Sequence, residues 1–131
     1  MNIKRVKSLA SVLALITACQ GCASGPRFPG AVHLVSSADI EIESATARQN
    51  LGGIRIAGDV RRTNGYAGTF PGHLHVTGRD AAGHVVAVTD VNWGEFMNRR
   101  FRLAYYKAFL EVGKPSSVAS IDVEVLANRL P

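Results

Sequence analysis

Hydrophobic and polar residues alternate along several short stretches of this chain, and a period of two is typical of strands with one buried face. Between 38 and 45, for example, Ile40 and Ile42 alternate with acidic residues. The pattern predicts strands at 31–35, 38–45, 54–61, 73–79, 84–91 and 118–126. The side chains expected to point inward are Ile40, Ile42, Ile54, Ile56, Val60, Ile121, Val123 and Val125.

The middle of the chain predicts a hairpin with its turn at Asp80-Ala81-Ala82-Gly83. Asp can accept hydrogen bonds from the backbone ahead of it, and Gly adopts the left-handed conformation without a Cβ clash. In the expected register, His73 faces Asp90 and His75 faces Val88. The core face of this hairpin is then expected to consist of Leu74, Val76, Val85, Ala87 and Val91.

The stretch 97–112 has two interpretations. A helix would gather Met97, Phe101, Ala104, Tyr105, Ala108 and Val112 on one face. A strand would place Phe101, Leu103 and Tyr105 on one face and Arg100, Arg102 and Ala104 on the other. The β-type surroundings favour a strand at 99–106, followed by an irregular or one-turn segment to Gly113.

Six or seven short strands without a convincing long helix predict an all-β fold. We expect a small antiparallel β-sandwich of immunoglobulin or fibronectin-III type after an N-terminal signal segment, with a small closed barrel as the alternative. Trp93 is expected to anchor the core. Tyr66 and Phe70, in the irregular segment 63–72, are expected to fold over the sheet.

The N-terminus has the pattern of a secretory signal. Lys4, Arg5 and Lys7 precede a run of small and apolar residues at 9–18. A span that stays in the membrane needs about 20 apolar residues, so this run is too short.

Ile16-Thr17-Ala18-Cys19 resembles the bacterial lipobox. The resemblance implies that Cys19 is the first residue after cleavage and carries diacylglycerol and an N-acyl chain such as palmitate. Gln20 in the next position implies the outer membrane, with the domain facing the periplasm. Cys22 is an alternative acceptor, and ordinary cleavage after Ala23 would give a secreted or soluble periplasmic protein. The expected organisation is a signal peptide at 1–18, a tether at 19–30 and the β-sandwich domain at 31–131.

Both cysteines precede the expected domain, which therefore has no internal disulfide and no thiolate metal site. Three of the 15 basic residues belong to the signal, which leaves 12 against 10 acidic residues, a net charge of +2. Basic residues are scattered without a recognised motif, so we expect no nucleic-acid partner.

Two small constellations could bind ligands. His73 and His75 lie on one strand face, and Asp90 opposite them could complete a site for copper or zinc. Arg99, Arg100 and Arg102 could bind an anionic partner such as lipopolysaccharide or cell-wall carboxylates, or could pair with the acidic stripe of Asp39, Glu41 and Glu43.

No nucleophile elbow, paired acid and base or phosphate cradle is evident, so the sequence predicts a non-enzymatic protein without a cofactor. The expected role is to bind an envelope component or assist envelope assembly, and the alternative is a periplasmic metal-binding protein. The stretches Ile-Arg-Ile-Ala-Gly-Asp-Val at 54–60, Pro-Gly-His-Leu-His-Val at 71–76 and Phe-Arg-Leu-Ala-Tyr at 101–105 resemble the small β-type lipoproteins that serve as pilotins. That resemblance implies a partner in the outer membrane.

Overall fold

The computed structural model describes residues 25–63, 69–97 and 102–127. These residues form two packed sheets, and the only helix among them is the 3-10 turn η1 (Pro115–Ser117), so the predicted all-β sandwich is confirmed. The strands are β1 (Ala31–Val35), β2 (Ile40–Ile42), β3 (Thr46–Asn50), β4 (Gly53–Arg62), β5 (His73–Arg79), β6 (Val85–Val91), β7 (Leu103–Glu111) and β8 (Ser120–Leu126). Within the same residues, no helix has the length and apolar character that crossing a membrane requires.

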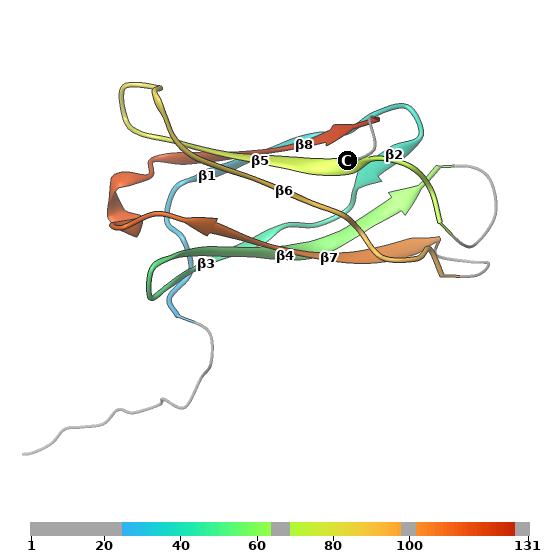
Figure 1. Ribbon diagram of the computed structural model, residues 1–131, viewed down its shortest axis with the longest axis horizontal. Helices are drawn as coiled ribbons and strands as arrows, with labels where there is room; N and C mark the ends of the chain where they lie inside the picture. Colours follow the sequence, from blue (N-terminus) through green and yellow to red (C-terminus); the bar gives the residue numbers. More distant parts are fainter. Residues whose placement is uncertain (1–24, 64–68, 98–101, 128–131) are drawn as a thin grey trace, which may run out of the picture.

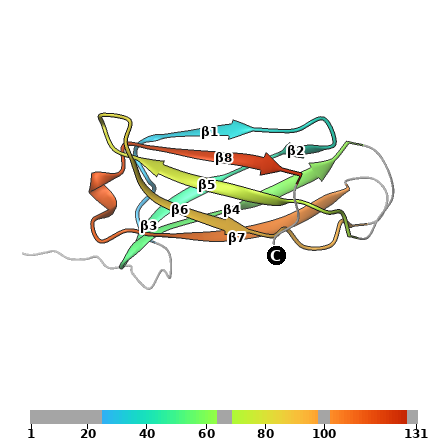
Figure 2. The same cartoon turned by 45° about the horizontal axis from the view of Figure 1, so that its top comes forward.

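Figures 1 and 2 show the two layers of the sandwich. One sheet has the strand order β1-β8-β5-β6. In the other, β4 lies in the middle, with β7 along one side and the short strands β2 and β3 along the other. The pair β1–β8 is parallel, and every other strand pair of the described residues is antiparallel. The antiparallel expectation therefore holds everywhere except at β1.

The hydrophobic side chains of the alternating pattern pack between the two sheets as predicted. Ile54, Ile56 and Val60 of β4 are fully buried and belong to the same core cluster as Ile121 and Val123 of β8. Among the residues that the structure describes, every buried hydrophobic residue lies between Phe28 and Val125, so the chain from Ala23 onward contains the complete described core.

Trp93 is buried in this core, as expected for its anchor role. Its indole N–H donates to the Phe70 carbonyl at 3.3 Å, and its ring meets the Phe96 ring edge to face at 6.2 Å. Gly72 has φ of +132°, and a Cβ there would lie 2.8 Å from the Trp93 ring, so only glycine suits this position. Phe70 packs against the core, whereas Tyr66 lies outside the described residues.

The hairpin of β5 and β6 forms, but its predicted register is wrong. The Asp80 N–H donates to the His84 carbonyl at 2.9 Å, which makes the turn longer, and a bulge follows at Gly78/Arg79. His75 rather than His73 therefore lies opposite Asp90. Because the shift is two residues, the side chains from Ala87 to Val91 keep their predicted faces, whereas the bulge places Val85 opposite Arg79. At the start of β6, however, Val85 is 53% exposed instead of buried.

The strand interpretation of the ambiguous segment is confirmed, but its predicted end at 106 is wrong. β7 runs to Glu111, because β4 offers pairing partners along its whole length from Gly53 to Arg61. The buried residues of β7 are Ala104, Tyr106, Ala108 and Leu110, whereas Tyr105 is 59% exposed. Arg102, with a left-handed φ of +47°, bends the chain just before β7.

Part of the expected tether is folded. The Phe28 N–H donates to the Ala47 carbonyl at 2.9 Å, and the Gln49 N–H donates to the Pro26 carbonyl at 2.8 Å. Phe28 itself is buried, and the chain then crosses to β1 in the other sheet. The domain therefore extends at least to Gly25, and the tether is shorter than expected at this end.

The side chain of Tyr106 connects β7 on one side of β4 with the segment between β2 and β3 on the other side. It pairs with Gly58 in the register of β4 and β7, and its hydroxyl donates to the Ser44 carbonyl at 2.8 Å, in the break between β2 and β3. A Cβ on Gly58 would lie only 2.1 Å from that carbonyl oxygen. Burial, followed by the nearby charge of Asp59, raises the pKa of Tyr106, so the hydroxyl remains a donor.

We predict that Tyr106→Phe lowers the free energy of unfolding by about 1 kcal/mol, because it removes one largely buried hydrogen bond without leaving a large cavity. Tyr105→Phe on the exposed face of the same strand is the matched control, with an expected change within about 0.5 kcal/mol. Urea unfolding of the two variants and the unmodified chain measures both values. Equal losses would show that the bond to Ser44 contributes nothing specific.

Candidate functional site

The outer face of the sheet β1-β8-β5-β6 carries the predicted histidines. His73 and His75 lie on β5, and His33 on β1 occupies the same face two strands away. Across the strands, His33 pairs in register with Asp122, and His75 pairs with Asp90 on one side and Glu124 on the other. This face, here called the histidine face, therefore alternates imidazoles with carboxylates.

The structure brings together the three residues proposed as metal ligands. Asp90 Oδ1 lies 2.7 Å from His75 Nδ1 and 3.3 Å from His73 Nε2. Both imidazoles thus approach the same carboxylate oxygen. Over the described parts of the chain, no three His, Cys, Asp or Glu residues form a group that could hold a metal ion. His84 is 80% exposed, and its Nδ1 lies 3.6 Å from Asp80 Oδ2 at the turn end of the hairpin.

A second group of charged side chains lies on the same face. Arg79 Nε donates to Asp122 Oδ2 at 2.9 Å, and His33 Nδ1 lies 3.1 Å from the other oxygen of that carboxylate. The hydrogen bond from Arg79, followed by the one with His33, holds the pKa of Asp122 below its usual value. Asp122 is therefore a fixed negative charge between two cationic or potentially cationic groups.

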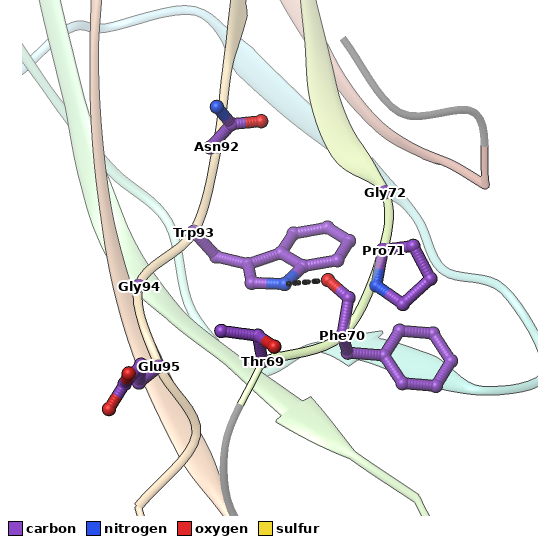
Figure 3. A pocket seen from close by; sticks show the side chains of 8 residues that line it. All are labelled: Thr69, Phe70, Pro71, Gly72, Asn92, Trp93, Gly94 and Glu95. Atoms are coloured by element: carbon purple, nitrogen blue, oxygen red, sulfur yellow. Dashed lines mark hydrogen bonds between the residues drawn. The ribbon is translucent and has the colours of Figure 1, made fainter.

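A pocket of about 490 Å³ opens where β5 begins and β6 ends. Trp93 lies in the middle of its wall, with Phe70 and Pro71 beside it (Figure 3). Asn92 and Glu95 provide polar groups toward its two ends. The Arg62 guanidinium lies 4.6 Å from the centre of the Phe70 ring and supports that wall. We call this the Trp93 pocket. Its volume is in the range of ligand sites. The only sequence feature that could have indicated it is the single Trp, which lies between Asn92 and the pair Gly94-Glu95.

Only Arg102 of the predicted arginine cluster belongs to the described residues. Arg99 and Arg100 lie outside them. Arg102 donates from a guanidinium nitrogen to the Thr63 carbonyl at 3.2 Å and so fastens the start of β7. The acidic stripe finds its partner in Arg61 of β4, which lies 3.6 Å from Glu41 and 3.7 Å from Glu43.

A different arginine group was missed by the sequence analysis. Arg27 forms a bridge with Arg48 of β3, and Arg48 pairs in register with Arg55 of β4. Directly opposite residues of antiparallel strands share a face, so the three side chains form one row on the outer face of the other sheet. The residues are 21 and seven positions apart in the chain, and local charge patterns cannot reveal such a row.

Comparison of the chain with protein-family models, curated proteins and solved structures gives no match. Cys19 and Cys22 lie outside the described residues.

We predict that Asp122 stabilises the fold only above its folded pKa. Because folding lowers this pKa, the unfolded chain takes up the proton first as the pH falls, and the stabilisation present above about pH 4 is lost below it. Asp122→Asn should cost about 1 kcal/mol at pH 7 and almost nothing near pH 2. Unfolding by urea at several pH values measures the difference, and a cost that does not change with pH would contradict the assignment.

The metal hypothesis is tested separately. If His73, His75 and Asp90 rearrange around copper or zinc, calorimetric titration should give one site that His75→Ala abolishes. His84→Ala is the matched control, since it removes an exposed histidine from the same hairpin. Weak binding that is equal in both variants would dismiss the site.

Proposed function

We propose that this protein is a non-enzymatic lipoprotein, anchored through Cys19 to the periplasmic leaflet of the outer membrane, that binds another component of the envelope. The signal pattern at 1–18 and the lipobox-like Ile16-Thr17-Ala18-Cys19 support the anchor. Several acyl chains bury many methylenes at about 0.8 kcal/mol each, so such an anchor is effectively permanent.

The single observation that carries the binding role is the separation of the anchor from the Trp93 pocket. Gly25 hydrogen-bonds the Asn50 side chain at the turn between β3 and β4, at one end of the sandwich. The pocket lies at the other end, where β5 begins and β6 ends (Figures 1 and 3). Only five residues lie between Cys19 and Gly25, so an anchored domain would keep the Gly25 end near the lipid and leave the pocket free.

The pocket suits a ligand that is partly apolar. Trp93 and Phe70 offer aromatic surface, while Asn92 and Glu95 offer hydrogen-bonding groups near the rim. An apolar centre with a polar border is typical of interfaces and ligand sites. We infer that a side chain or loop of an envelope protein enters here.

The anchor is tested by mass spectrometry of protein extracted from membranes. We expect a processed chain that begins at Cys19 and carries three acyl chains, and we expect Cys19→Ala to abolish both processing and membrane attachment. Cys22→Ala is the matched control and should leave both unchanged. A chain that begins after Ala23, or one that still carries Met1, would contradict the anchor.

The pocket is tested by photo-crosslinking in living cells. A benzophenone side chain in place of Asn92 should give one defined adduct with an envelope protein. The same group in place of Ala81, which is also exposed but lies at the opposite end of the sandwich, should give none. Absence of an adduct from Asn92, or the same adduct from both positions, would refute binding through the pocket.

A further inference from the structure

The row of Arg27, Arg48 and Arg55 is an unfavourable arrangement within the isolated domain. These residues are direct cross-strand neighbours on one sheet face. Like charges placed directly opposite each other destabilise a sheet. The row therefore reduces the stability of the fold unless an anion lies against it.

No carboxylate among the described residues forms an ion pair with these three arginines. Arg48 donates only to a backbone carbonyl, that of Gly25, at 3.3 Å. On the same face of β4, by contrast, Arg61 has two carboxylate partners, Glu41 and Glu43. The face is thus charge-balanced at one end and positive at the end near Gly25.

Two further residues extend the positive end. Phe109 of β7 pairs in register with Arg55, so its side chain continues the row, and it is 41% exposed. Lys107 lies on the same exposed face of that strand. Glu111, at the end of β7, is the one acidic side chain of the described strands at this end of the face. An exposed aromatic ring among cations suits a membrane interface, where the ring enters the headgroup layer and the cations meet phosphates.

We propose that this face, made of Arg27, Arg48, Arg55, Lys107 and Phe109, rests on anionic phospholipid headgroups. The inference builds on the proposed function, because the anchor would hold the Gly25 end, and with it this face, at the membrane. A lipid surface is favoured over an acidic protein because the row lies beside the residue that leads to the anchor, and Arg48 itself hydrogen-bonds that residue. A membrane also supplies many phosphates at once, and each cation near an anionic surface contributes.

This contact would orient the domain. With the sheet of β2, β3, β4 and β7 on the lipid, the histidine face of the other sheet points away from the membrane, because the two sheets lie on opposite sides of the sandwich (Figure 2). The Trp93 pocket, at the far end from Gly25, stays accessible in this orientation.

The test uses the chain from Ala23, which contains the complete described core and neither cysteine, so that its outcome does not depend on lipidation. Co-flotation is measured with phosphatidylcholine vesicles with and without phosphatidylglycerol. We expect binding only to the anionic vesicles, weakened at high salt. Arg55→Gln should lower the partition coefficient about fivefold, since one cation near the surface is lost.

Arg61→Gln is the matched control, because it removes the same charge from the same face of β4 but at the balanced end. Its partition coefficient should stay within about twofold of the unmodified chain. Arg55→Gln should also raise the urea midpoint slightly, because it relieves the like-charge row. Equal binding to neutral vesicles, or equal losses from the two variants, would overturn the proposal. A failed anchor with intact vesicle binding would refute the lipoprotein assignment alone.

Discussion

The burial of one face of β4 is the constraint on which the rest of the structure depends. Its isoleucines and Val60 have no exposed surface, and the strand pairs with β7 on one side and with β2 and β3 on the other. A ten-residue strand with partners along both edges fixes the register of its whole sheet. It therefore also decides which charges meet on the outer face, including the pairs Arg48–Arg55 and Arg55–Phe109.

Alternation along the chain was sufficient to predict every described strand except β3 and most of the core, because a period of two depends only on local geometry. Alternation failed to predict strand ends and strand register where these depend on an element distant in the sequence or on the geometry of a turn. The predicted end of β7 at 106 ignored the length of β4, which extends the pairing to Glu111. The hairpin register was missed because the Asp80 carboxylate accepts the His84 N–H at 2.9 Å and lengthens the turn.

The candidate sites divide in the same way. His73 and His75 are two residues apart, so the sequence alone places them on one face, and the register shift changed only which of them lies opposite Asp90. The arginine row is assembled from three separate segments and requires the register of β3, β4 and residues 25–28. The Trp93 pocket likewise needs the segment before β5 and the segment after β6 to lie side by side. Sites within one strand can be predicted from sequence, whereas sites between strands need the fold.

The two outer faces of the sandwich differ in how their charges are compensated. On the histidine face, Asp90 and Asp122 each contact two cationic or protonatable side chains, so the charges are satisfied within the domain. On the other face, the arginine row near Gly25 has no such carboxylates among the described residues. Exposed ion pairs contribute up to about 1 kcal/mol each, so the difference between the faces has a modest effect on folding. Its larger consequence is for recognition: a face whose cations are already paired offers little to an anion, whereas a row of unpaired guanidinium groups presents several hydrogen-bond donors to the same anionic surface.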